Sequence, residues 1–192
     1  MLRHAIDELK IILNKIESSN FDNSVRNTVD ILGNAFRSNN KLLLIGNGGS
    51  AAEAQHMAAE YTATLYSKNF RKGYPAIALT TDTSFITAWS NDFGLEELFA
   101  RQVRTLGCQG DILFAYSTSG NSANIIKAVE EAQTKSILTV GFCGNDGGNL
   151  AQICDVAFVV PSKSTARIQE IHTLLGHTIC GQVENLLGDI VK

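Results

Sequence analysis

A histidine and a glutamate stand four residues apart just after a glycine-rich turn. The segment "GNGGSAAEAQHMAAEYTA", which begins at Gly46, places His56 and Glu60 in an expected Ala-rich helix. Residues four apart on a helix are neighbours, so the pair can share a metal ion, or the imidazole can orient the carboxylate as a base. A surface contact and a capped core histidine are the alternatives.

Similar residues recur in the last helical stretch, "ARIQEIHTLLGHTICGQVE", which carries His172 and His177. At about 100° per residue, Glu170 and His177 differ by about 20° around the helix axis, whereas Gln169 and His177 differ by about 80°. Spacing alone favours Glu170 but does not settle which residue faces a site. Together with the earlier pair, these residues form either a metal or catalytic site or ordinary core and surface histidines.

A hydroxyl-rich turn leads from an expected strand into a helix in "AYSTSGNSANIIKAVEEA". Its hydroxyls belong to Ser117, Thr118, Ser119 and Ser122. Hydroxyls and free N–H groups at a helix N-terminus favour an anion such as a phosphate ester, whereas ordinary N-capping needs one hydroxyl only. No lysine follows directly, so the turn is not a Walker-type loop, and it suits a phosphosugar better than a nucleoside triphosphate.

The glycine turn formally matches the G-x-G-x-x-A fingerprint of dinucleotide-binding proteins. That fingerprint needs an acidic residue about 20 positions further on, and residues 61–75 contain none. We therefore interpret the turn as a place where the backbone approaches a polar ligand closely, since glycine has no Cβ. The residues concerned are Asn47, Gly48, Gly49 and Ser50.

The segment "SNDFG" at 90–94 contains the D-F-G letters of protein kinases. A chain of this length without the partner motifs is not a kinase. Asn91 and Asp92 instead either cap the following helix or hydrogen-bond the hydroxyls of a ligand.

Hydrophobic periodicity predicts the elements that position these residues. From residue 2 to about residue 39, apolar residues recur at helical spacing and "SSNFDN" interrupts them, which predicts two helices before any strand. Five short apolar runs then alternate with helical segments, which predicts a parallel sheet with helices on both faces. The runs are "LLLIG", "AIALT", "ILFAYS", "ILTVGF" and "VAFVV". A long helix is expected from Thr165 to about Leu187, and ligands are expected beyond the carboxyl ends of the strands.

Composition limits the class of protein. A chain of 192 residues that is 44% hydrophobic is long enough for one substantial core, so we expect a single domain over residues 1–192. The formal net charge of −3 and the scattered Lys and Arg argue against nucleic acid as a partner. Without a signal-peptide pattern or an apolar run of the ~18 residues that a span needs, no membrane association is expected.

The four cysteines are far apart, form no C-x-x-C pair and lie in apolar surroundings. They are Cys108, Cys143, Cys154 and Cys180. We interpret them as reduced core thiols, which favours a cytoplasmic location.

Four segments together resemble the phosphoheptose isomerases, the sedoheptulose 7-phosphate isomerases of the sugar isomerase (SIS) superfamily. They are "GNGGSAAEAQH" with the glutamate that follows, "TTDTSFITAWSNDFG", "STSGNSANI" and "ARIQEIHTLLGH". The resemblance covers nearly the whole chain from Lys41 onward. It implies a three-layer αβα sandwich with a five-stranded parallel sheet, preceded by two N-terminal helices within residues 1–39 that join subunits into a homotetramer with active sites at subunit contacts.

The implied activity is conversion of the ketose D-sedoheptulose 7-phosphate to D-glycero-D-manno-heptose 7-phosphate, the first step toward nucleotide-activated heptose for bacterial surface polysaccharide. The implied ligands of one Zn²⁺ per subunit are His56, Glu60, Gln169 and His177, with Glu60 also the catalytic base and His177 the acid. The family thus selects Gln169 where helical angle favours Glu170. The implied substrate-binding residues are Asn47, Gly48, Gly49, Ser50, Glu60, Asn91, Asp92, Ser117, Thr118, Ser119, Ser122 and Gln169.

Two positions depart from the family pattern. Thr64 stands where many members carry an arginine whose planar fork helps to hold an anionic substrate, and Ala166 stands where some have an acid. The alternative function is that of the non-catalytic SIS relatives, which bind phosphosugars or associate with the bacterial replication initiator. Glu60 discriminates between the two, because a protein that does not isomerise its ligand has no need of a carboxylate base there.

Overall fold

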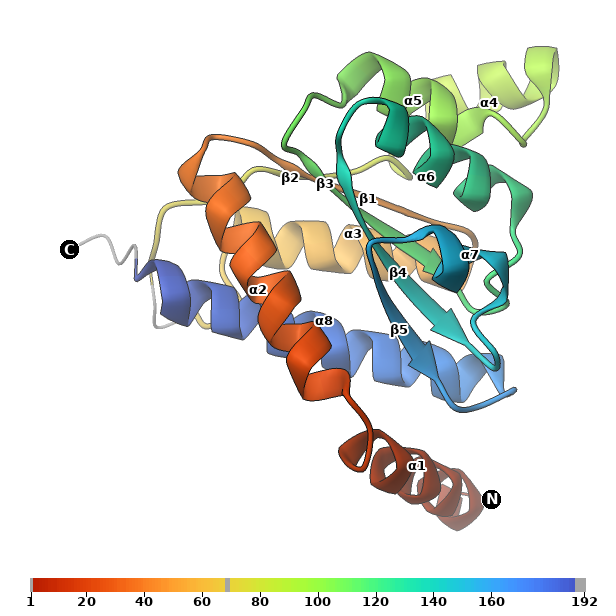
Figure 1. Ribbon diagram of the computed structural model, residues 1–192. Helices are drawn as coiled ribbons and strands as arrows, with labels where there is room; N and C mark the ends of the chain where they lie inside the picture. Colours follow the sequence, from red (N-terminus) through yellow and green to blue (C-terminus); the bar gives the residue numbers. More distant parts are fainter. Residues whose placement is uncertain (1, 68–69, 189–192) are drawn as a thin grey trace.

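The computed structural model describes residues 2–67 and 70–188 and contains the expected parallel sheet (Figure 1). All neighbouring strands pair in parallel, in the order β2-β1-β3-β4-β5. The strands are β1 (Leu42–Gly46), β2 (Ala76–Ala78), β3 (Ile112–Ser117), β4 (Leu138–Gly144) and β5 (Val156–Val160). Each lies within or over one of the five predicted apolar runs, although β2 ends two residues earlier and β4 continues to Gly144.

The helices also follow the predicted pattern. They are α1 (Leu2–Glu17), α2 (Phe21–Arg37), α3 (Gly49–Thr62), α4 (Thr83–Phe93), α5 (Leu98–Leu106), α6 (Ala123–Thr134), α7 (Gly148–Ile153) and α8 (Thr165–Leu187). The break in the N-terminal region is shorter than "SSNFDN", because Phe21 already begins α2 and packs its ring 5.6 Å from that of Phe158.

Alternate strand residues enter two separate cores, which makes the molecule a three-layer sandwich. Leu42, Leu44 and Phe114 point toward α2, α3 and α8, whereas Leu43 and Leu113 point toward α5, α6 and α7. Figure 1 shows the same division, with α2, α3 and α8 on one side of the sheet and α5 and α6 on the other. The predicted fold class is confirmed.

The sheet order places a topological switch point between β1 and β3. The chain winds outward in one direction from β1 to β2 and in the other from β3 to β5, and a crevice forms where these directions part. The glycine turn follows β1 and the hydroxyl-rich turn follows β3, so both predicted ligand-binding turns lie at this crevice.

The cysteine interpretation is wrong at one position. All four thiols are free, and Cys143 and Cys180 are buried, but Cys108 is exposed in the loop between α5 and β3. Among the residues that the structure describes, no helix combines the length and apolarity needed to cross a membrane.

Candidate active site

The helices α3 and α8 lie side by side and run in the same direction. Gly49 lies against Gln169, and the hydroxyl of Thr173 donates to a Glu53 carboxylate oxygen over 2.6 Å. Further along, the backbone N–H of Leu65 donates to Glu184 over 2.8 Å. Each contact joins residues about 120 positions apart, so the two helices keep one register over several turns.

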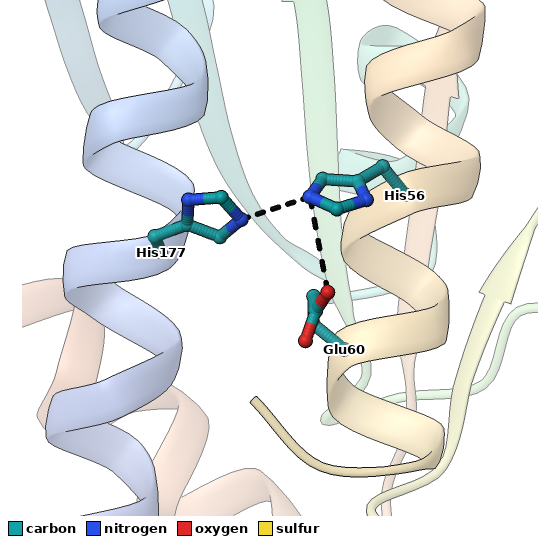
Figure 2. Close-up of side chains that lie close together, drawn as sticks. All are labelled: His56, Glu60 and His177. Atoms are coloured by element: carbon teal, nitrogen blue, oxygen red, sulfur yellow. Dashed lines mark hydrogen bonds and ion pairs between the residues drawn. The ribbon is translucent and has the colours of Figure 1, made fainter. Parts of the chain in front are cut away.

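This register brings His56, Glu60 and His177 together (Figure 2). The two Nε2 atoms of the histidines are 2.8 Å apart, and His56 Nε2 is 3.8 Å from a carboxylate oxygen of Glu60. The His56 side chain is 45% exposed and that of Glu60 is 20% exposed. The group therefore opens toward solvent and is accessible to a ligand.

The donor atoms of these three residues are arranged as a candidate metal centre. One ligand atom from each lies within 4.8 Å of the others, and imidazole nitrogens and carboxylate oxygens bind divalent metals. Without an ion, the contact between the two imidazoles requires one ring to donate and the other to accept. Three of the four residues that the resemblance implies as metal ligands therefore lie together within one chain.

The contact with α3 is made by Gln169 and not by Glu170. A Cβ atom added to Gly49 would lie 2.6 Å from the Gln169 carboxamide nitrogen, so any larger residue there would displace the end of this side chain. Glu170 is exposed and pairs with Arg167. Gln169 lies eight residues before His177, about 12 Å along the helix, and its role as a ligand stays a prediction.

Sequence reasoning missed Glu53 and Thr173, which form the middle contact between α3 and α8. Oε1 of Glu53 is buried without a hydrogen-bond partner. Each residue lies about one turn before a histidine of the site, and helical spacing from His56 and His177 was the signal that could have found them.

His172 is a core histidine, one of the two interpretations left open by the sequence. It is 1% exposed, and its Nε2 lies 3.1 Å from the carbonyl oxygen of Cys143, to which it donates. Burial lowers the pKa of His172 to about 4, although the hydrogen bond that His172 donates to the Cys143 carbonyl opposes the shift.

The hydroxyl-rich turn keeps its side chains free of helix capping. Ser122 is the N-cap residue of α6 but makes no side-chain cap bond, and its Oγ accepts instead from Ser117 Oγ over 3.1 Å. Thr118 and Ser119 line a pocket of ≈ 410 Å³ that Lys163 also lines. Ser119 Oγ accepts from the backbone N–H of Asn121 over 3.2 Å and likewise caps no helix. A lysine and non-capping hydroxyls at a helix N-terminus favour an anionic group.

The glycine turn contacts the hydroxyl-rich segment directly across the switch point. The side-chain amides of Asn47 and Asn124 exchange two hydrogen bonds of 2.9 Å each. Gly48 is exposed with φ of 53°, a left-handed conformation that favours glycine, whereas Ser50 is 5% exposed. Asn124 was not predicted, because only the fold brings it next to the turn.

Asn91 and Asp92 do not cap the following helix, so that alternative is wrong. Both are exposed in the last turn of α4, where the Asn91 amide donates to Asp92 over 2.8 Å. The next helix begins at Leu98 with Glu97 at its N-cap. Hydrogen bonding to a ligand's hydroxyls stays a prediction.

Comparison with known proteins gives one consistent result. A family model described as SIS domain matches residues 6–144. A phosphoheptose isomerase of Burkholderia pseudomallei is 50% identical over 162 residues, which cover 84% of this chain and 81% of the relative. Phosphoheptose isomerase 2 of Campylobacter jejuni is 45% identical over 184 residues, which cover 96% and 90%.

A solved structure agrees with these relatives. The phosphoheptose isomerase of Neisseria gonorrhoeae superposes with a TM-score of 0.88 at 38% identity, and the match covers 96% of this chain and 97% of that chain.

Proposed function

The chain belongs to the SIS-domain phosphoheptose isomerases, and we propose that it converts the ketose D-sedoheptulose 7-phosphate to the aldose D-glycero-D-manno-heptose 7-phosphate. This reaction supplies heptose for nucleotide activation and bacterial surface polysaccharide. The observation that carries the proposal is the meeting of His56, Glu60 and His177 on α3 and α8 in a chain about 50% identical to such enzymes. The substrate class is a phosphorylated seven-carbon sugar.

In this proposal Glu60 is the catalytic base and His177 is the acid. Glu60 takes a proton from C1 of the ketose and delivers one to C2, while His177 gives a proton to O2 and takes one from O1. The remote phosphate binds to Ser117, Thr118, Ser119 and Ser122, and this binding positions the reacting carbons. The other substrate contacts we propose are Asn47, Gly48, Gly49, Ser50, Asn91, Asp92 and Gln169.

We further propose that the metal is zinc, one ion per subunit. Ligand atoms about 2.0–2.1 Å from a tetrahedral zinc ion lie about 3.3 Å from one another, between the 2.8 Å and 3.8 Å separations of this site. The donors His56, Glu60 and His177 fit such an ion. Gln169 is the fourth ligand we propose, and because it lies about 12 Å along α8 from His177 within one chain, it would come from a neighbouring subunit. When bound, zinc polarises the substrate oxygens.

The test is incubation of the purified chain with sedoheptulose 7-phosphate in D₂O, followed by NMR. We expect the aldose to form and deuterium to appear at the carbon that receives the proton. Binding of the sugar phosphate with neither aldose nor deuterium incorporation would reject the isomerase and favour a phosphosugar-binding protein.

For assembly, we propose one SIS domain per chain in a cytoplasmic homotetramer joined through residues 1–39. In support, α1 buries only Ile12 among its described residues, while apolar side chains along it are 40–74% exposed. These are Leu2, Ile6, Ile11 and Leu13. An exposed apolar stripe is most simply covered by another copy in a closed symmetric assembly.

Deletion of residues 1–38 should therefore give dissociated or insoluble protein without isomerase activity. Light scattering that found a monodisperse, fully active monomer, whole or truncated, would contradict this assembly.

A further inference from the structure

The last turn of α3, which carries Glu60, is closed by the side chain of Arg71. The final carbonyl groups of a helix have no partner within it, and α3 ends at Thr62 without a glycine cap. The Arg71 guanidinium supplies the missing donors: Nη2 donates to the carbonyl of Glu60 over 2.8 Å and Nη1 to that of Tyr61 over 2.9 Å.

The same guanidinium joins α3 to α8 through Glu184. Nε of Arg71 donates to Glu184 Oε1 over 2.8 Å, and the side chains are only 2% and 4% exposed. Oε1 also accepts from the backbone N–H of Leu65, and the guanidinium carbon lies 4.0 Å from the ring centroid of Tyr74. Arg71 therefore links the end of α3, the helix that carries His177, and the approach to β2.

The rate of proton transfer depends closely on where the general base lies. Helix termini fray, and a displacement of about 1 Å in a catalytic group can cost on the order of 10²-fold in rate. Because Arg71 bonds the main chain of Glu60 itself, loss of these bonds frees the turn that carries the base, while His56 lies one turn further inside the helix.

We propose that Arg71 is a positioning residue for Glu60, which it holds in register with His177 by joining the last turn of α3 to Glu184. The inference rests on the proposed function, because it assigns Arg71 to the same site. A buried ion pair is by itself weak grounds for a stabilising role. Two bonds to successive helix carbonyls with a third to a carboxylate instead require the planar fork of arginine, which lysine does not have.

The variant Arg71→Lys keeps the charge and removes the fork. We expect kcat and kcat/KM to fall equally, by about 10–100-fold. The substitution disturbs the base that acts on the reacting carbons and leaves the hydroxyl-rich turn, where the phosphate binds, unchanged. Titration with Zn²⁺ alone should show a loss of affinity of about 10–100-fold. Amide exchange at the end of α3 should become faster.

The matched control is Asp111→Asn, which breaks another buried ion pair. Asp111 is 1% exposed and pairs with Lys41 over 2.6 Å at the amino ends of β1 and β3. This variant should lower the melting temperature and leave kcat and Zn²⁺ affinity unchanged. Glu184→Gln keeps an acceptor for Nε of Arg71. Its losses of kcat and of Zn²⁺ affinity should lie between those of the control and those of Arg71→Lys.

If Arg71→Lys lowered the melting temperature but left kcat and Zn²⁺ affinity unchanged, as the control does, the positioning role would be rejected. A variant that does not fold is replaced by Glu184→Gln, in which unchanged kcat and Zn²⁺ affinity together with unchanged exchange in α3 would equally reject it. If the wild-type chain lacks isomerase activity, the proposed function fails separately. Zn²⁺ affinity and amide exchange then decide the role of Arg71.

Discussion

The amino and carboxyl ends of the strands differ in how their polar side chains are used. At the amino ends, Asp111 accepts from the Lys41 ammonium and from the backbone N–H of Cys108, and Asp155 accepts from both the backbone and the hydroxyl of Thr139. At the carboxyl ends, the Ser122 hydroxyl accepts from Ser117 and caps no helix.

The difference separates residues that hold the sheet from residues that are available to a ligand. A carboxylate that already accepts several internal hydrogen bonds has little capacity for a substrate, whereas a hydroxyl that only accepts one bond keeps its own O–H to donate to an anion at the helix N-terminus. The site of His56, Glu60 and His177 between α3 and α8 resembles the carboxyl ends in this respect, since the side chain of His56 is nearly half exposed. Variants at the two ends should therefore have different consequences.

The largest effect on turnover is expected for Glu60→Gln. The amide keeps the shape and removes the basicity, so kcat should fall by about 10²-fold or more, while thermal unfolding changes little. The control is Glu130→Gln, an exposed glutamate on α6, which should leave kcat unchanged. Near-normal turnover of Glu60→Gln would remove Glu60 as the base.

A smaller effect, on KM, is expected for Ser122→Ala. Loss of one hydrogen bond to a charged phosphate is worth about 1.5–3 kcal/mol, so KM should rise about tenfold or more. Stability should also fall, by the ~0.5–1.5 kcal/mol of one hydrogen bond, because the Ser117 hydroxyl loses its acceptor. Asp82→Ala provides the contrast: Asp82 caps α4 by accepting from Phe85 N–H, and its loss should cost about 1 kcal/mol of unfolding free energy. Asp82→Ala should leave KM unchanged, and an equal rise of KM in both variants would contradict the distinction.

His172 is an exception to the difference between the two ends of the strands. It lies near the carboxyl end of β4, yet its side chain is already hydrogen-bonded, to the carbonyl of Cys143. Its pKa of about 4 lies below the value of about 6.5 in an unfolded chain. The unfolded state therefore binds more protons between these values, and stability should fall by up to about 3 kcal/mol as pH drops from about 6.5 to 4. Urea unfolding at pH 7 and pH 5 should show a smaller decrease in His172→Gln than in the wild type; identical decreases would rule out His172 as the cause.

The smallest effect on turnover, none, is expected for Asp111→Asn. Burial alone would raise the pKa of Asp111, but hydrogen bonds from Lys41 and Cys108 outweigh burial and lower it below its usual value. The carboxylate thus stabilises the fold above the unfolded pKa of about 3.9, and this contribution is lost as pH falls through the folded pKa. Acid unfolding of the variant should show a weaker pH dependence near this range, with kcat unchanged at neutral pH. A variant with lower kcat would mean that the amino ends also serve the reaction.

Local pattern was sufficient to predict most of the fold, because apolar periodicity and turn residues act over a few positions. Long-range packing was needed for the rest. Helical angle favoured Glu170, yet in the folded chain the carboxamide of Gln169 lies against Gly49 of α3. The role of Arg71 could not be predicted from the sequence, because its partner Glu184 lies 113 positions away. Cys108 was misplaced because apolar neighbours in sequence do not bury a residue in a loop.

The constant register between α3 and α8 determines where the chain tolerates changes of length. Deleting one residue between Thr173 and His177 would turn the imidazole by about 100° and move it by about 1.5 Å relative to the contacts before it. The same deletion in the loop around Cys108 would leave both helices in place. Insertions and deletions that accumulate during evolution should therefore avoid these two helices and fall in the loops that connect the strands.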